Sequence, residues 1–452
     1  MMRFEHRRSR LAVASVAAIA LGVIAGCSSS SSTTTTPPAT SSSTATGAPA
    51  STSASAAPAD ATSACGTNPG VKATGSPITI GAINTKVPGT DFSDIENMTG
   101  AYFACVNDNG GINGHPIKFI PVTEQINPSQ IAALAKQLVT SDHVLGMVGT
   151  SSILECGVNA AYWKQQGFNV IAAGIAPECY ATPNYADVNM GPRYSSDGAV
   201  QYAVAQHVSK VVFDQANVPG TGYIAAGPNA IAKAANTPIQ NFADNVPIND
   251  ANSVALKLVN AAGSNGAVVL NFTPPEALVI LQAAQKLGLE DRVKLWGCST
   301  PCNTDFLAQS LGPKWNHKVF VNAELTPPDT DTSPTMQLYK AILKQYGSSV
   351  TGGIGSFSQM GFTIAEIATH ALESIKGDYT VQSVNQAFEN VKDFNTGMLC
   401  EPWTFGTYPF HIANNVDYTV TPENGKMVIA QGCTPISAAD PQIAAYRKLT
   451  GG

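Results

Sequence analysis

Charged residues are scarce in this sequence, and their scarcity narrows the choice of protein class. Only 12% of the 452 residues are Asp, Glu, Lys or Arg, and the formal net charge is −6. No basic cluster follows the first ten residues, so a surface that binds nucleic acid through its phosphates is not expected.

Short catalytic motifs are also missing. The sequence contains no Gly-x-Ser-x-Gly, no His-Glu-x-x-His, no Gly-x4-Gly-Lys-Ser/Thr and no Gly-x-Gly-x-x-Gly stretch, although each of these is a common mark of an enzyme or nucleotide site. The seven histidines are scattered, and we expect His207 and His317 to be structural or solvated. An extracellular enzyme is therefore the weaker alternative, and no cofactor is expected.

One apolar run stands near the N-terminus, and it is too short for a membrane span. It extends from Leu11 to Ile24, broken only by Ser15, and follows four arginines: Arg3, Arg7, Arg8 and Arg10. A transmembrane helix needs ~20 apolar residues, whereas a basic stretch before a shorter run is typical of an export signal. The pair Arg7-Arg8 is a weak hint of twin-arginine export.

The next stretch can build no core. From Ser28 to Ala64 the residues are almost wholly Ser, Thr, Ala and Pro, and Asp60 is the only charge. With no apolar face to bury, this stretch is expected to be a disordered tether.

Nine cysteines are present in a chain predicted to be exported. Cys27 follows the apolar run, and for the other eight, oxidation is the default outside the cytoplasm. We expect neighbours in sequence to pair: Cys65–Cys105, Cys156–Cys179, Cys298–Cys302 and Cys400–Cys433. Zinc is an alternative for Cys298 and Cys302, but no second cysteine pair or ordered histidine pair completes four ligands, so no metal is expected.

The body after the tether alternates short β-rich runs with amphipathic helical stretches, which is typical of βαβ units in a mostly parallel sheet. It is longer than one hydrophobic core usually supports, so two α/β lobes are expected. The clearest predicted strands are 78–83, 115–122, 143–149 and 168–174, and the clearest helices are 91–109 and 127–141.

Thr150, Ser151 and Ser152 follow the third predicted strand and precede a helix. Ligands of open α/β sheets lie beyond the carboxyl ends of the strands, where helix N-termini favour anions. These residues are therefore candidate ligand contacts, with ordinary N-capping as the alternative. Ala173, Gly174 and Ile175 end the next strand, where small residues permit close approach of a ligand or form a tight turn.

The segment Leu21-Gly-Val-Ile-Ala-Gly-Cys27 resembles a bacterial lipoprotein lipobox. The resemblance implies that residues 1–26 are a signal peptide and that Cys27 becomes the lipidated N-terminus. Residues 27–75 would then be anchor and tether, since two or more acyl chains hold a protein stably on a membrane. The alternative is an ordinary cleaved signal with a chance cysteine.

Four stretches of the body, namely "MTGAYFACVNDNGGINGHPIKF", "GTSSILECGVNAAYWKQQGFNVIAAGIAPECY", "SNGAVVLNFTPPEALVILQAAQKLGL" and "FSQMGFTIAEIATHALESI", resemble substrate-binding lipoproteins of ABC transporters, of the leucine/isoleucine/valine-binding type. The resemblance implies the type I periplasmic-binding-protein fold: α/β, with two Rossmann-like lobes of mostly parallel sheets joined by a three-segment hinge. Lobe 1 would comprise 76–207 and 327–399, and lobe 2 would comprise 208–326 and 400–452.

The same resemblance implies ligand-binding positions in the interlobe cleft. They are Phe92, Ser93, Thr150, Ser151, Ser152, Ala173, Gly174, Ile175, Val218 to Tyr223, Thr273, Ser299, Glu324, Gln359 and Phe362. The amine-binding glutamate of the family falls at Ser299, and a hydroxyl-bearing position falls at Ile175. Either Glu324 binds the amine instead, or the ligand has none, as in an amide, a small carboxylate or an aromatic acid.

The expected function is therefore that of an exported, non-enzymatic receptor on the outer face of the cell membrane. It would capture a small polar molecule, such as a branched-chain amino acid, an amide or a small carboxylate, and deliver it to the permease and ATPase of an ABC importer. We expect a monomer held to the membrane by its lipid alone. A sensing lipoprotein of the same fold without a transport role is the alternative.

Overall fold

The computed structural model describes residues 65–451. The predicted signal peptide, the lipidation of Cys27 and the tether up to residue 64 lie outside these residues. The predicted tether extended to residue 75, but residues 65–75 are attached to the first lobe. Cys65 is bonded to Cys105, the Ala73 N–H donates to the Asn107 carbonyl, and both Cys65 and Ala73 are buried.

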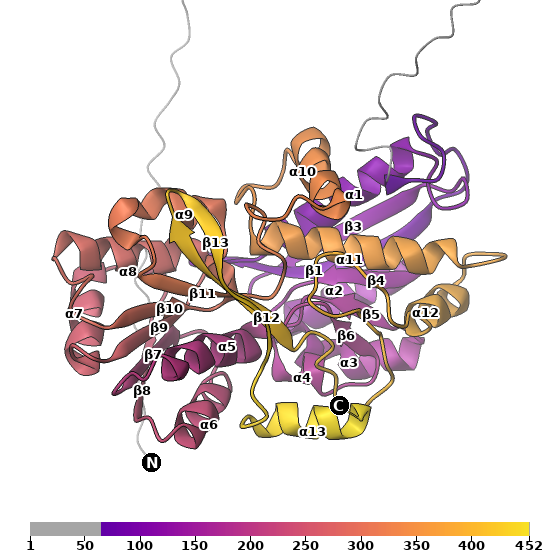
Figure 1. Ribbon diagram of the computed structural model, residues 1–452. Helices are drawn as coiled ribbons and strands as arrows, with labels where there is room; N and C mark the ends of the chain where they lie inside the picture. Colours follow the sequence, from indigo (N-terminus) through magenta and orange to yellow (C-terminus); the bar gives the residue numbers. More distant parts are fainter. Residues whose placement is uncertain (1–64, 452) are drawn as a thin grey trace, which may run out of the picture. The chain divides into compact units, whose positions relative to one another are not determined.

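The first lobe is built on a mostly parallel sheet of six strands (Figure 1). β3 pairs with β1, and the remaining order is β2-β1-β4-β5-β6. Its strands are β1 (Ile78–Val87), β2 (Thr90–Asp91), β3 (Ile117–Glu124), β4 (Gly146–Thr150), β5 (Val170–Ala172) and β6 (Tyr185–Asp187). Its helices are α1 (Ser93–Asp108), α2 (Pro128–Thr140), α3 (Glu155–Gln166), α4 (Pro177–Tyr180), α10 (Pro334–Tyr346), α11 (Ser356–Glu373) and α12 (Val381–Glu389).

The second lobe is built on a seven-stranded sheet with the order β13-β12-β11-β10-β9-β7-β8. Its strands are β7 (Val211–Ala216), β8 (Ile239–Asp244), β9 (Ala267–Asn271), β10 (Leu295–Cys298), β11 (Val319–Ala323), β12 (Val416–Glu423) and β13 (Lys426–Pro435). Five strands are parallel, and β12 and β13 form an antiparallel hairpin at one edge. The hairpin turn is Asn424-Gly425, both with positive φ, as a two-residue turn of this kind requires.

The helices associated with the second lobe are α5 (Gly191–Ala205), α6 (Ala226–Ala234), α7 (Ala251–Ala262), α8 (Pro274–Lys286) and α9 (Asp305–Leu311), with the short 3₁₀ turns η2 (Thr300–Cys302) and η3 (Pro313–Trp315). The last helix is α13 (Pro441–Thr450). In Figure 1 it lies below α3 and α4, and its Ile443 is part of a core cluster that contains Trp163 of α3.

Helix α2 shows how the sequence pattern becomes structure. Asn127 caps it by accepting from the Ser129 and Gln130 N–H groups, and Pro128 occupies its first position, where a missing N–H costs nothing. Its buried residues are Ile131, Ala135 and Leu138, spaced four and three apart as one helical face requires.

The chain passes between the lobes at three predicted crossings, and the observed boundaries differ from the predicted ones at two of them. In addition, α13 was predicted in lobe 2, but its Ile443 packs in a core cluster of lobe 1. The first crossing precedes α5, although lobe 1 was predicted to extend to residue 207. Ala199, Val200 and Ala203 of α5 pack in one cluster with Val211 and Phe213 of β7, because this helix covers the second sheet. At the third crossing the chain stays longer with lobe 1, since Trp403 and Phe405 belong to its core. The second crossing follows β11, where the Thr326 N–H already donates to the Met398 carbonyl.

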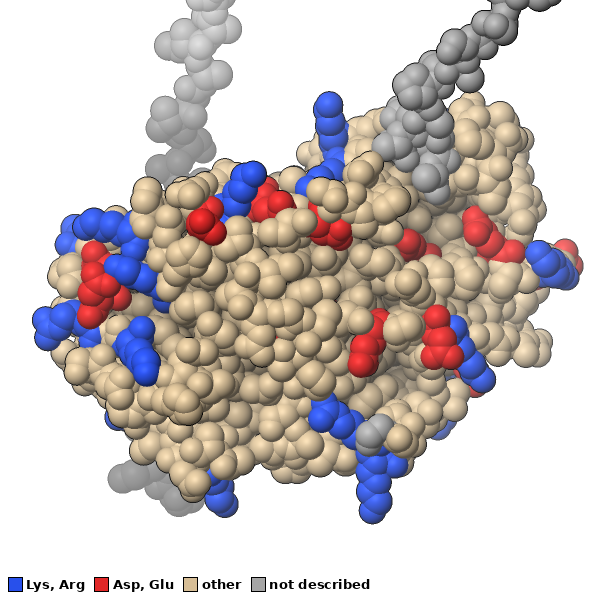
Figure 2. Space-filling view, viewed as in Figure 1, with Lys and Arg blue, Asp and Glu red and all other residues tan. Residues whose placement is uncertain are grey.

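The four disulfides join the predicted pairs, Cys65–Cys105, Cys156–Cys179, Cys298–Cys302 and Cys400–Cys433. Within residues 65–451, no helix is long and apolar enough to cross a membrane, and no group of His, Cys, Asp and Glu side chains could hold a metal ion. Charged side chains are sparse on the face shown in Figure 2.

Candidate ligand-binding cleft

A cavity of about 100 Å³ lies where the carboxyl ends of the two parallel sheets meet. The segments that follow β1, β4, β5, β6, β7, β9, β10 and β11 all contribute to its wall. This is the place where open α/β sheets bind ligands. The lining residues are Gly89, Thr90, Phe92, Ile95, Ile153, Ala173, Ile175, Asn189, Gly191, Pro192, Ser195, Ala216, Val218, Thr221, Ile224, Asn271, Phe272, Thr273, Thr300, Pro301, Glu324, Phe357 and Met360.

Most of this wall is apolar. Phe92 and Phe357 from lobe 1 meet edge to face with ring centroids 5.6 Å apart, and Ile153 lies in the same wall. Lobe 2 contributes Ile224 and Phe272. The apolar part of a ligand would therefore touch both lobes at once.

Glu324 is the one ionisable side chain in the wall. It follows β11 directly, its side chain is 6% exposed, and its Oε2 accepts the Met190 N–H at 2.6 Å. Burial raises the pKa of the Glu324 carboxyl to about 8, against the opposing effect of the Met190 N–H. The carboxyl group is therefore protonated and uncharged at neutral pH.

Direct contacts between the lobes hold the cavity closed. The Tyr223 hydroxyl donates to the Ile175 carbonyl, and the Thr273 hydroxyl donates to the Gly89 carbonyl at 3.3 Å. At the other rim the Ser356 N–H donates to the Asn303 carbonyl at 3.0 Å. These bonds join the two lobes directly around the cavity.

Gly89 shows how tightly the lobes approach. Its φ is +77°, and a Cβ atom there would lie 2.9 Å from the Val246 side chain of lobe 2. A larger residue would strain the backbone and push the lobes apart.

Five of the predicted contact residues line the cavity: Phe92, Ala173, Ile175, Thr273 and Glu324. From the predicted segment Val218 to Tyr223, Val218 and Thr221 also line it. Tyr223 itself contributes through its hydroxyl bond to the opposite lobe.

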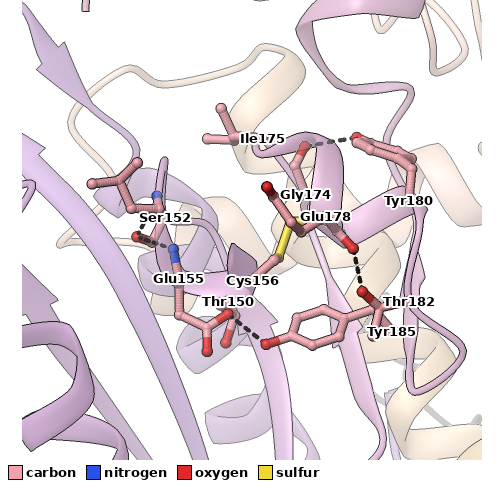
Figure 3. The surroundings of a disulfide bond; sticks show 12 residues. Thr150, Ser152, Glu155, Cys156, Gly174, Ile175, Glu178, Tyr180, Thr182 and Tyr185 are labelled. Atoms are coloured by element: carbon pink, nitrogen blue, oxygen red, sulfur yellow. Dashed lines mark hydrogen bonds between the residues drawn. A yellow bond between two sulfur atoms is a disulfide. The ribbon is translucent and has the colours of Figure 1, made fainter. Parts of the chain in front are cut away.

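The Ser-containing loop does not line the cavity, because its hydroxyl groups are engaged inside lobe 1. The Ser151 hydroxyl donates to Glu96 at 2.6 Å, and the Thr150 hydroxyl lies 3.4 Å from the Ile83 N–H. The Ser152 hydroxyl donates to Glu124 and accepts the Glu155 N–H at 3.2 Å (Figure 3). This last bond ties the loop to the first residue of α3, but the N-cap residue of α3 is Leu154 and it makes no side-chain cap, so the N-capping alternative is not confirmed.

Four further predicted residues also lie outside the cavity wall, and three of them contact other partners. Ser93 donates to Asp91 at 2.6 Å, Gln359 donates to the Thr326 carbonyl, and Phe362 packs against Tyr102. Ser299 is fully buried behind η2, and its hydroxyl has no partner within residues 65–451.

Gly174 has a structural role. Its carbonyl accepts the Tyr180 hydroxyl at 2.7 Å (Figure 3) and the Asn189 amide at 2.9 Å. Its neighbour Ile175 points away from the Cys156–Cys179 bridge in the same view.

Sequence reasoning missed two groups of lining residues. Asn189, Gly191, Pro192 and Ser195 were missed because the first crossing was placed too late. Apolar residues such as Ile95, Ile153 and Met360 resembled ordinary core. The position directly after each predicted strand was the available signal, and it would have pointed to Phe272, which follows β9.

The sequence of residues 77–425 matches the family model described as periplasmic binding protein. The chain belongs to this family. Its fold is the type I fold of these proteins, as solved structures show. A branched-chain amino acid ABC transporter protein from Thermus thermophilus, solved with bound valine, is similar with a TM-score of 0.70 and 16% identity, covering 84% of this chain and 100% of the other.

Two further solved structures share the fold. A fatty acid ABC transporter substrate-binding protein from Thermomonospora curvata gives a TM-score of 0.69 at 17% identity, covering 83% of this chain and 95% of the other. An R. palustris solute binding protein in complex with 4-hydroxybenzoate gives 0.64 at 14% identity, covering 80% and 98%. No curated protein matches the sequence.

Proposed function

We propose that this protein is an extracytoplasmic solute-binding lipoprotein that captures a small molecule between its lobes and delivers it to an ABC importer. The observation that carries the proposal is the closed cavity, whose wall comes from both lobes. A ligand held this way favours the closed form, and closure presents a changed surface to a partner.

Three features support an extracytoplasmic location with attachment to the membrane. The family is named for periplasmic binding, four disulfides suit an oxidising compartment, and the lipobox-like segment ends in Cys27. The partners would be a permease and an ATPase, and the monomer would attach to the outer face of the membrane through its lipid. Solved proteins of this fold carry ligands as different as valine and 4-hydroxybenzoate, so the fold leaves the ligand class open.

A thermal-shift screen of the purified full-length chain tests the binding function. The compounds are amino acids, amides, small carboxylates and aromatic acids, and a ligand of the folded state raises Tm with its concentration. Ala216→Leu, which adds side-chain volume at the end of β7 inside the cavity, should abolish the shift. The matched control Ala132→Leu, on the exposed face of α2, should keep it. A shift that survives Ala216→Leu would place binding elsewhere.

Membrane fractionation tests the anchor. Cys27→Ala removes the acceptor thiol, so the protein should move from the membrane pellet to the soluble fraction, because no other membrane attachment is proposed. Continued sedimentation of the variant with membranes would contradict lipid anchoring at Cys27.

A further inference from the structure

The polar end of the cavity is formed by Glu324 and the start of α5. Gly191 and Pro192 line the cavity, and the residue before them, Met190, donates its N–H to Glu324 Oε2. The Met190 N–H is the only hydrogen bond to this carboxyl group within residues 65–451, so the other oxygen, Oε1, has no partner there. Because Glu324 lines the cavity and Oε1 is not among the enclosed atoms that lack a partner, this oxygen is available to a ligand.

The start of α5 adds a favourable field for an anion. No side chain caps its first turn, and Pro192 has no N–H to offer, but the free N–H groups that remain at a helix start carry partial positive charge. The same field disfavours an ammonium group.

Gly191 makes the close approach of this helix start possible. Its φ is +69°, and a Cβ atom there would lie 2.0 Å from the Tyr180 hydroxyl. Only glycine fits both the backbone conformation and the contact.

The groups around Glu324 leave it without an ionic partner. Arg193 on α5 is held by Asp440 in two hydrogen bonds of 2.7 and 2.9 Å. Burial raises the pKa of Tyr180 on α4 and of Tyr223 well above their usual value, and it raises the pKa of Asp187 on β6 to about 8. These three groups are therefore uncharged at neutral pH.

A zwitterion would find only one ionisable side chain, Glu324, in this cavity, because the other polar residues of the wall are neutral. The loop that could have taken a second charged group has its hydroxyls bonded to Glu96 and Glu124, and Ile153 and Ile175 form the wall there instead. Burying an unpaired charge against such a wall is costly.

We propose that the cleft takes a small monocarboxylic acid with an apolar body and no ammonium group, whose carboxylate accepts a hydrogen bond from the protonated side chain of Glu324. This inference rests on the proposed binding function. The acid proton of Glu324 is on Oε1, while Oε2 keeps the Met190 N–H. The cavity of about 100 Å³ is smaller than the engineered apolar cavity of about 150 Å³ that takes a benzene ring, so the space here suits a short branched chain better than a ring.

Titration calorimetry of the full-length chain with two matched series tests the head group. The first series is 3-methylbutanoate, 3-methylbutanamide, 3-methylbutylamine and leucine, and the second is benzoate, benzamide, benzylamine and phenylalanine. The carboxylate should bind at least ~10-fold more tightly than the amine or the amino acid of its series, since a buried unpaired ammonium is costly.

The number of protons exchanged on binding shows whether Glu324 donates a hydrogen bond in its protonated form or pairs with an ammonium group in its ionised form. Titrations at pH 7 in two buffers of different ionisation enthalpy should show no net proton release with the carboxylate. A ligand whose ammonium pairs with ionised Glu324 would expel about one proton. Between pH 7 and pH 9 the carboxylate affinity should fall on the order of tenfold, because the binding-competent protonated fraction of Glu324 falls by that factor.

Glu324→Gln is the decisive variant, because glutamine can accept the Met190 N–H and still donate to a carboxylate. The carboxylate affinity at pH 7 should stay within about threefold of the wild-type value, since the donor is retained, and the fall toward pH 9 should disappear. Glu366→Gln is the control, since burial also raises the pKa of Glu366 to about 8 but this residue lies outside the cavity wall. It should leave the pH dependence unchanged.

The outcomes also separate this inference from the proposed function. Preference for the amine or the amino acid, or loss of binding in Glu324→Gln, would overturn the carboxylate assignment while leaving a solute-binding cleft. The carboxylate assignment would also be overturned, with the solute-binding cleft retained, if no member of either series binds but another compound binds the wild-type protein and not Ala216→Leu. Absence of any cavity-dependent ligand in the wide screen would overturn both.

Discussion

Two regions at the carboxyl edges of the sheets contain polar groups, but only one of them lines the cavity. In the loop after β4, the hydroxyls of Ser151 and Ser152 are bonded to buried carboxylic side chains. At the start of α5, the Glu324 carboxyl has one oxygen bonded and one without a partner in the described chain. Residue type alone did not distinguish the two regions, and Glu96 also has one carboxyl oxygen, Oε2, without a partner in the described chain. The difference is that Glu324 lines the cavity and Glu96 does not.

Among the variants that test the difference between these two regions, Ser151→Ala should lower stability most, because it breaks the Ser151–Glu96 bond. Ser151→Ala leaves the fully buried Glu96 carboxyl without its donor, so the free energy of unfolding should fall by about 1 to 3 kcal/mol, while ligand affinity should stay unchanged. Urea denaturation and calorimetry measure the two quantities.

The matched control for that variant is Ser93→Ala. Its hydroxyl bonds to Asp91 at the surface, so stability should change by no more than about 0.5 kcal/mol. If Ser151→Ala weakened ligand binding as strongly as it lowered stability, the loop after β4 would be part of the ligand site after all.

A smaller loss, this time of ligand affinity, is expected when a hydrogen bond between the two lobes is removed. Tyr223→Phe removes the hydroxyl that donates to the Ile175 carbonyl, a bond that exists only when the lobes are closed. Losing it should weaken ligand affinity by about 1 kcal/mol, or roughly fivefold, with less effect on the urea midpoint of the unliganded protein.

Tyr202→Phe is the control, because the Tyr202 ring packs against Phe320 with centroids 4.7 Å apart and its hydroxyl has no partner within residues 65–451. Equal losses of affinity in both tyrosine variants would mean that the Tyr223 hydroxyl does not contribute to closure.

Much of the fold followed from the sequence because its signals are local. The cap at Asn127, the apolar spacing of Ile131, Ala135 and Leu138, and the short β-rich runs placed the elements of the first half within a few residues. The crossing before α5 did not follow, because the apolar face of α5 shows that the helix is buried without showing against which sheet.

The residues of the cavity were predicted only in part, because local sequence signals locate strand ends but not hydrogen-bond partners. Residues next to strand ends, such as Ala173, Ile175 and Glu324, could be located from the order of elements. The role of Ser151 depended on Glu96, and that of Glu324 depended on Met190. These partners are far apart in the chain, so no local pattern in one sequence reveals them.

A crystal structure of the complex with the best ligand of the screen tests the central claim most directly. The account predicts that the ligand lies between the lobes, with its polar head within hydrogen-bond distance of Glu324 and its body against Phe92 and Phe357. A ligand bound instead at the hydroxyls of Ser151 and Ser152, with Glu324 unchanged, would contradict it.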